Sequence, residues 1–270
     1  MRDDLPDLMQ RWARGWASAR ELSVREVERG LRIDVGATSR RWEVVLFAPT
    51  AERVGAIAAQ VSAHPDAWMT LDADAARTYA RETAGLEVVT AVEALMTRPI
   101  ERLPPVEAVA VESTGQRGFA GIDVDGRVAA TGVVAVEHAD AVFDRIETDP
   151  AFRRRGLGSR IMNALSGWAF EHGARTGILA ASADGQLLYE RLGWTVACPL
   201  ISFPRDRRLT SLRDYVNGLL RQRERHLQEH RDDSLLGVLG HGPLGIAAQD
   251  AELVTFRIAE HDPSGSVVLA

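Results

Sequence analysis

The chain has 270 residues, enough for one large domain or two small ones. Its 46% hydrophobic and 26% charged content is that of an ordinary soluble globular protein. The formal net charge of -6 argues against a general nucleic-acid binder, which is basic overall. All 32 Lys+Arg residues are arginine, which excludes a P-loop because that motif needs a lysine on the phosphates.

The compartment is expected to be the reducing cytoplasm. The single cysteine, Cys198, cannot form an internal disulfide. The first ten residues, MRDDLPDLMQ, carry acids and no apolar run, so they do not resemble a signal peptide. No segment approaches the roughly 18 apolar residues of a membrane span, so no membrane partner is expected.

The first hundred residues read as an α/β half. Apolar residues at helical spacing predict a helix over 5–17, and Thr50 is a candidate N-cap for a second helix that stops near Pro65. The remaining expected elements are strands at 31–36, 41–47, 67–71 and 86–92 and a helix at 73–84. Three prolines in 98–107 indicate a linker.

Beyond the linker, the pattern predicts a second domain over 105–204. Two alternating runs around Asp125-Gly126 indicate a hairpin over 119–137. A helix closed by Gly173 and a short helix capped by Asp184 lie between later strands at 141–149, 176–182 and 194–203. This order predicts a mixed sheet with helices packed on it. Residues 205–270 suggest a polar helix and two weak strands, with no readable role.

The stretch RRRGLGS at 153–159 admits several interpretations. A dinucleotide fingerprint is disfavoured because Ile161 stands where the third glycine belongs. A nucleic-acid patch is disfavoured because three arginines are few and no aromatic residues interleave them. A further alternative is that the stretch binds no ligand and is only a glycine-rich helix start with solvated arginines. An anion cradle fits better, since glycines allow close approach and the first amides of a helix attract phosphate.

Residues 118–194 resemble the GCN5-related N-acetyltransferase (GNAT) superfamily. Its hallmark, Q/R-x-x-G-x-G/A after the fourth strand, is matched by Arg153, Gly156 and Gly158. A second signature, L-Y-E-x-L-G-F/W, is matched by Leu188 to Trp194. The resemblance implies an α/β (α+β) fold with a mixed, mostly antiparallel sheet and flanking helices, here preceded by a smaller α/β half at 1–100.

The resemblance also implies acetyl-CoA, or another acyl-CoA, as co-substrate, no metal, and direct attack of an amine on the thioester. Tyr189 matches the tyrosine that protonates the leaving thiolate in many members. The pantetheine arm would pair with backbone groups near Ile146 and Thr148. The pyrophosphate would lie on Arg153, Arg154, Arg155, Gly156, Leu157, Gly158 and Ser159. The acceptor is an unidentified amine, either a small molecule or a peptide, and a homodimer is left open.

Several departures from the family leave questions open. Ser182 replaces the common asparagine seven residues before the tyrosine. The general base is not identified: Asp144 and Glu147 are candidates, and deprotonation through water is an equal alternative. The linker leaves no room for the family's first two helices, so the N-terminal half either supplies that layer or is a degenerate second GNAT-like unit, which we favour.

Because of these departures, a second function stays open. The protein would then be a catalytically inactive acyl-CoA-binding regulatory or interaction module. Acetylation of aminoacyl-tRNA is less consistent with the acidic total charge, and no nucleic-acid partner is expected. His226 to His230 spell a zinc-protease pattern, H-x-x-E-H, but the surrounding polar residues favour a solvated helix. Cys198 is interpreted as a small buried hydrophobic residue rather than a nucleophile.

Overall fold

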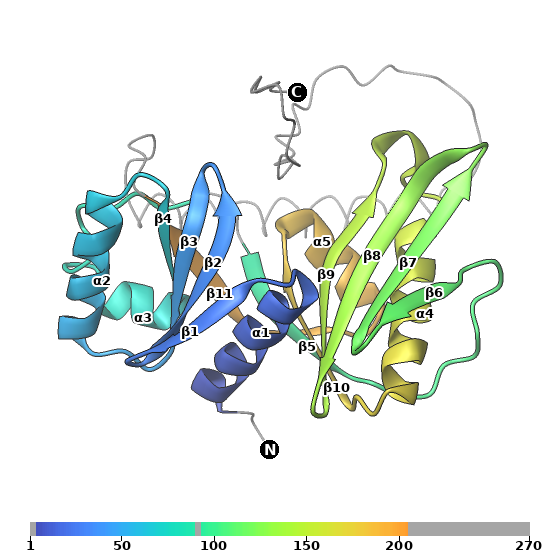
Figure 1. The fold of residues 1–270 in the computed structure, drawn as a ribbon, viewed down its shortest axis with the longest axis horizontal. Coiled ribbons are helices and arrows are strands. Elements are labelled where there is room, and N and C mark those ends of the chain that lie inside the picture. Colours follow the sequence, from blue (N-terminus) through green and yellow to red (C-terminus); the bar gives the residue numbers. More distant parts are fainter. Residues whose placement is uncertain (1–3, 90–92, 205–270) are drawn as a thin grey trace, which may run out of the picture. The chain divides into compact units, whose positions relative to one another are not determined.

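The computed structural model describes residues 4–89 and 93–204, which form one mixed sheet flanked by helices (Figure 1). The helices are α1 (Leu5–Ala19), α2 (Ala51–Ala63), α3 (Ala73–Thr78), the 3-10 turn η1 (Pro150–Phe152), α4 (Leu157–Glu171) and α5 (Ala183–Arg191). The strands are β1 (Ser23–Val27), β2 (Gly30–Ala37), β3 (Arg40–Leu46), β4 (Ala67–Asp72), β5 (Glu93–Pro99), β6 (Val111–Thr114), β7 (Arg117–Val124), β8 (Arg127–Glu137), β9 (Asp140–Thr148), β10 (Thr176–Ala181) and β11 (Thr195–Phe203).

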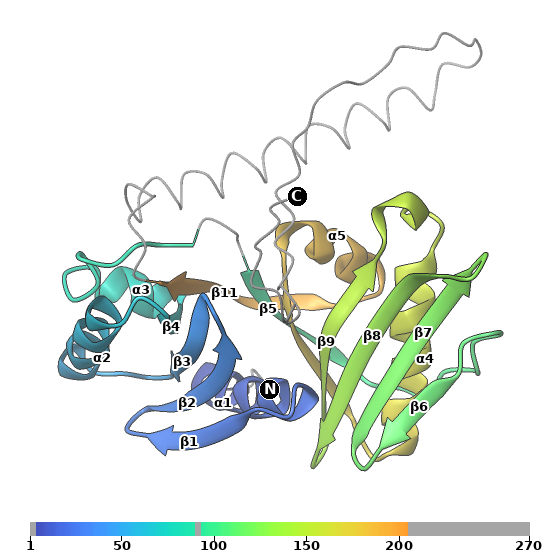
Figure 2. The same cartoon turned by 45° about the horizontal axis from the view of Figure 1, so that its top comes forward.

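The described strands lie in the order β1-β2-β3-β4-β11-β5-β10-β9-β8-β7-β6 (Figure 2). Every neighbouring pair is antiparallel except β3–β4 and β9–β10, which are parallel. The sheet is therefore mostly antiparallel, and the predicted fold class is confirmed. No helix among the described residues is long and apolar enough to cross a membrane.

The described part repeats one connectivity. The segment β1-β2-β3-α2-β4-α3-β5 has the same order of elements as β7-β8-β9-α4-β10-α5-β11. The last strands are exchanged, because β5 pairs with β10, β11 pairs with β4, and both pair with each other. That the N-terminal half is a degenerate GNAT-like unit stays a prediction, as does the division near residues 100–105.

Two apolar cores lie on opposite faces of the central strands. The first contains α4 residues such as Ile161 and Leu165 together with Phe143 of β9. The second lies beneath α1, whose Trp12 and Trp16 pack with Val142 of the same strand. Phe143 and Val142 are adjacent, so the two cores follow the alternation of side chains along β9. This alternation decides below which side chains face which helix.

Most expected elements were found, with shifts at their ends. Asp125 and Gly126 both have positive φ, 53° and 74°, as a tight hairpin turn requires. The helix predicted over 73–84 ends at Thr78. The cap predicted at Asp184 is wrong, because the Ser182 side chain accepts a hydrogen bond from the Gly185 amide (3.3 Å). The short, polar strands β1 and β6 had no apolar run to reveal them.

The strand predicted at 86–92 is wrong over its first four residues, and residues 90–92 lie outside the described residues. No strand is present over 86–89, where the amides of Glu87 and Val89 only bond to the end of β11. The described strand, β5, covers Glu93–Pro99 and takes in residues 98 and 99 of the expected linker. Register within a long apolar run is set by the neighbouring strands, which the sequence alone does not reveal. Residues 205–270, with their predicted helix, strands and zinc pattern, lie outside the described residues.

Candidate active site

Strands β9 and β10 separate partway along their length. They pair only at Asp140 to Val142 with Thr176 to Ile178, although β9 continues to Thr148. Beyond Val142, the edge of β9 that faces β10 therefore has no strand partner among the described residues. Unpaired peptide groups on a strand edge can bind an extended chain as an added strand. The predicted contacts Ile146 and Thr148 both lie on this free stretch.

The free stretch of β9 contains a bulge. Thr131 pairs with Glu147 and Val133 with Asp144, so Arg145 and Ile146 together face one residue of β8. Arg145 has a positive φ of 49°, and Ile146 packs into the core on the α4 side. A bulge turns the local peptide groups away from the regular ladder, and bulges are common beside active sites. Here it lies where the two strands have parted.

The chain leaves β9 through η1 and three arginines and enters α4. Gly156 is the N-cap of α4 and has a left-handed conformation (φ 75°), which favours glycine. The first helical bond is donated by the Arg160 amide to the Gly156 carbonyl (3.1 Å). The amides of Leu157, Gly158 and Ser159 consequently have no partner within the helix. Such amides, at the positive end of the helix dipole, form an anion-binding site.

A side chain at position 158 would be crowded. A Cβ built there would lie 3.1 Å from Leu188 Cδ2 of α5 and 3.5 Å from Thr148 Oγ1. Position 158 is thus where the start of α4, the end of β9 and the tyrosine helix α5 approach one another. Both signature motifs meet at this point.

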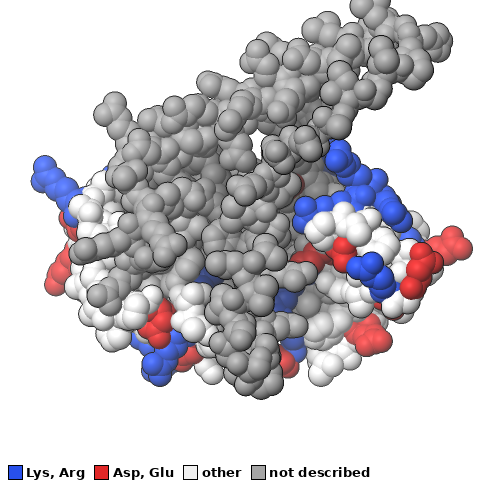
Figure 3. Space-filling model, turned by 90° about the horizontal axis from the view of Figure 1, so that it is seen from above, with Lys and Arg blue, Asp and Glu red and all other residues white. Residues whose placement is uncertain are grey.

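The three arginines of the loop are exposed. Arg153 Nε donates a hydrogen bond to the Thr148 carbonyl (3.3 Å), and the Arg155 guanidinium lies 5.3 Å from the centre of the Phe152 ring. Among the described residues no carboxylate forms an ion pair with Arg153, Arg154 or Arg155. Figure 3, which looks down on the end of the sheet where α5 lies, shows basic side chains gathered over the β6–β9 half. Their charge is available to an anion.

Tyr189 lies in the apolar core on the α4 side of the sheet. Its side chain is buried, and its ring is 6.0 Å from the Trp194 ring. Burial, and secondarily the charge of Asp144, raises the pKa of the Tyr189 hydroxyl above its ordinary value of 10. The hydroxyl therefore stays protonated at any working pH and can act as a donor.

The two carboxylates considered as bases differ in their surroundings. Asp144 accepts two hydrogen bonds from Arg20, at 2.5 Å from Nε and 3.0 Å from Nη2, and this pair is largely buried. Glu147 is exposed to solvent. Asp144 is therefore held in a bidentate ion pair, and Glu147 is the only one of the two that is free to move. Cys198 is buried, and burial raises the pKa of its thiol to about 12, so no thiolate is available.

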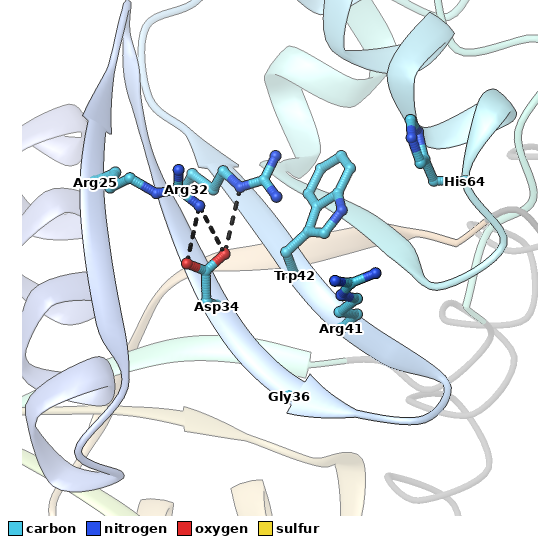
Figure 4. Close-up of a pocket in the computed structure, with 7 residues that line it drawn as sticks. All are labelled: Arg25, Arg32, Asp34, Gly36, Arg41, Trp42 and His64. Carbon is cyan, nitrogen blue, oxygen red and sulfur yellow. Dashed lines mark hydrogen bonds and ion pairs between the residues drawn. The ribbon is translucent and has the colours of Figure 1, made fainter.

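A separate open pocket lies on the N-terminal half (Figure 4). It is lined by Arg25, Arg32, Asp34, Gly36, Arg41, Trp42 and His64. Asp34 binds Arg25 (3.0 Å) and Arg32 (3.4 Å), and Arg32 also lies 4.1 Å from the Trp42 ring centre. Three of the charged side chains that line this pocket thus bind one another. None of the predicted site residues lines it. Within the described residues, no group of three or more His, Cys, Asp or Glu side chains is placed to hold a metal.

The mixed, mostly antiparallel sheet with its flanking helices is the α/β fold of GNAT-type acetyltransferases. Residues 89–194 match the model of the acetyltransferase (GNAT) family. This part of the chain carries a GNAT domain, and the domain and its fold support an N-acetyltransferase. Among curated proteins, none matches the sequence significantly.

Solved structures of the same fold extend the likeness beyond residues 89–194. A GCN5-related N-acetyltransferase from Kribbella flavida is 18% identical with a TM-score of 0.51, covering 72% of this chain and 94% of that chain. A protein assigned to the GNAT acetyltransferase family from Novosphingobium aromaticivorans DSM 12444 is 16% identical with a TM-score of 0.53, covering 76% of this chain and all of that chain. At these identities the likeness shows a shared fold.

Proposed function

We propose that this protein transfers an acetyl group from acetyl-CoA to a primary amine by direct attack on the thioester. The observation that carries the proposal is the path of one continuous segment. The unpaired edge of β9 runs through the Arg153–Arg155 loop to the free amides at the start of α4. A strand edge followed by an anion site matches a ligand with an amide-bearing arm and a pyrophosphate.

The pyrophosphate lies on the amides of Leu157 to Ser159, with the three arginines supplying charge-assisted hydrogen bonds. The pantetheine arm pairs with the backbone near Ile146 and Thr148. The thioester then reaches the bulge of β9, where a peptide N–H steadies the oxyanion. Tyr189 donates a hydrogen bond to the leaving sulfur.

Titration calorimetry with acetyl-CoA tests the donor site. We expect binding at sub-millimolar concentration, weakened by Arg155→Ala and unchanged by Arg77→Ala. Arg77 is a matched control because it is an exposed arginine on α3, distant in sequence from the loop. Absence of binding by the wild-type chain, or equal binding by both variants, would contradict the proposal.

A catalytically inactive acyl-CoA-binding module is the second candidate, and it is favoured because neither candidate carboxylate of β9 is free and turned toward the sheet interior. Asp144 is held by Arg20, and Glu147 points to solvent. Thiol release from acetyl-CoA across a panel of primary amines separates the two functions. Turnover that depends on Tyr189 supports the transferase, whereas binding without turnover by any amine supports the module.

A further inference from the structure

Glu93, the first residue of β5, faces the side of the sheet opposite Tyr189. Leu95, two residues on, belongs to the core beneath α1, whereas Ala94 and Met96 belong to the core that contains Tyr189. Because side chains alternate along a strand, Glu93 points to the same side as Leu95. A nucleophile that approaches a thioester held between β9 and β10 from the α1 side would meet Glu93, with the leaving sulfur toward Tyr189.

Glu93 also lies at the level where the strands have parted. Ala94 pairs with Ala181, the last residue of β10, and Glu93 pairs with Leu200 on β11. The β9–β10 pairing ended three residues earlier along β10, at Ile178. Figure 1 shows β5 beginning at the end of the sheet where α5 lies. Glu93 therefore lies level with the end of β10, which is the strand that borders the gap.

A cluster of charged groups surrounds this position on the α1 side. Arg20, the C-cap of α1, holds Asp144 of β9, while Arg40 of β3 pairs with Glu43. Both guanidiniums lie over the Trp16 ring, at 5.5 Å and 5.0 Å from its centre. Glu43 is fully buried and accepts a hydrogen bond from Thr70 Oγ1 (2.6 Å). Two of the three carboxylates in the cluster are thus committed to arginines.

Glu93 is the third carboxylate and differs from the others. It interacts electrostatically with Arg40, Arg20 and Asp144, yet no other described residue holds it in a hydrogen bond or a short ion pair. Its partner on β11, Leu200, is uncharged. A carboxylate that is near cations but not locked by them can accept and release a proton.

We propose that Glu93 is the general base that deprotonates the acceptor amine. The inference rests on the proposed function and adds the group missing from it. Burial raises the pKa of Glu93 above its ordinary value, against the opposing effects of Arg40 and Arg20 and with a further increase from Asp144. A base of raised pKa is better matched to an ammonium group than an ordinary glutamate.

Acetyl transfer moves one proton to Glu93 and one to the leaving sulfur. Glu93 takes one proton from the acceptor ammonium, and the nitrogen lone pair forms the C–N bond at the thioester carbonyl carbon. The C–S bond breaks with its electron pair on sulfur, which is protonated through the Tyr189 hydroxyl. The extra proton of the acetylated nitrogen restores that hydroxyl, and Glu93 returns its proton to solvent. The products are the acetamide and free CoA.

Steady-state kinetics of Glu93→Gln tests the proposal, with Glu112→Gln, an exposed glutamate on β6, as the matched control. The probes are acetyl-CoA and the panel amine with the highest wild-type turnover. We expect kcat/KM at neutral pH to fall by about 100-fold or more in Glu93→Gln. The Kd of acetyl-CoA should be unchanged. The loss of kcat/KM should become smaller at high pH, because the amine is then already deprotonated in solution. The control should behave as wild type.

Wild-type kcat/KM and pH profile in Glu93→Gln would overturn the assignment of Glu93 while leaving the proposed function intact. Failure of the wild-type chain to bind acetyl-CoA would instead remove the proposed function, so the two failures are distinguishable. If Glu93→Gln does not fold, Glu93→Asp carries the test. Reduced turnover with a displaced acid limb supports the base, and an unchanged limb overturns it.

Discussion

Tyr79 and Tyr189 occupy equivalent positions in the two repeated segments. Each stands seven residues after the N-cap of its helix, which is Asp72 for α3 and Ser182 for α5. The Tyr79 hydroxyl donates a hydrogen bond to the carbonyl of Pro49 (2.7 Å), in the loop that follows β3. That loop is short and has neither the glycines nor the arginines of the loop after β9. The N-terminal tyrosine is therefore engaged with its own loop.

This difference predicts that only Tyr189 affects turnover. Tyr189→Phe should lower kcat by roughly 10- to 100-fold with little change in the Kd of acetyl-CoA, because the hydroxyl acts on the leaving sulfur. Tyr79→Phe, its matched control, should keep wild-type kcat and lose about 1 kcal/mol of unfolding free energy with its hydrogen bond. Equal kcat in both variants would contradict the role of Tyr189.

The same difference between the two loops predicts one donor site. Calorimetry should give a stoichiometry of one acetyl-CoA bound per chain.

The start of α4 should be sensitive to charge. Gly158→Asp places a carboxylate at the free amides and beside Leu188, so the Kd of acetyl-CoA should rise by 100-fold or more, corresponding to about 2.7 kcal/mol. Gly121→Asp is the control, since position 121 on β7 is exposed and has open space around it. Calorimetry compares the two. Similar Kd values would show that the pyrophosphate is bound elsewhere.

The Arg20–Asp144 pair should stabilise the fold far more than a surface pair. Arg20→Met leaves Asp144 largely buried without its partner, and we expect a loss of about 2–4 kcal/mol in urea unfolding. Arg77→Met breaks a pair with Asp74 in which both side chains are about three-quarters exposed, and it should cost less than about 1 kcal/mol. If Arg20→Met loses no more unfolding free energy than Arg77→Met, the Arg20–Asp144 pair does not stabilise the fold.

The proposed donor site can be read from the sequence because its residues are local in the chain. Only α4 and β10 separate the loop over 153–159 from α5 in the chain. The positive φ of residue 156 favours glycine at that position. Glu93 could not be found this way, since it reaches the site only through pairing of β5 with β10 and β11. One signal was present and missed. Ala73-Asp74, then Tyr79-x-Arg81, repeats the spacing of Ala183-Asp184, then Tyr189-x-Arg191.

Direct transfer requires no cysteine. Cys198 is buried and its pKa is raised to about 12, so its thiolate is scarce at neutral pH. Cys198→Ala should retain wild-type turnover, and initial-rate patterns should be those of a ternary complex. Parallel, ping-pong patterns that disappear in Cys198→Ala would indicate an acyl-enzyme instead.

The pH dependence of Glu93 makes stability and activity change in opposite directions. Its pKa is raised in the folded chain, so the folded state holds this proton over a range where the unfolded chain has lost it. The contribution of Glu93 to stability is therefore full below the unfolded pKa of about 4.5 and is lost as pH rises through the folded value. Activity has the reverse sign, because the base works only when ionised.

Glu93→Gln should consequently unfold at higher urea concentration than wild type at neutral pH, and the advantage should vanish toward pH 4. The wild-type kcat/KM should rise with pH along an acid limb above pH 4.5, and this limb should be absent in Glu93→Gln. Urea midpoints and kcat/KM measured over the same pH series check both. A variant that is less stable than wild type at neutral pH, with its acid limb intact, would mean that Glu93 is an ionised partner of Arg40 and not a base.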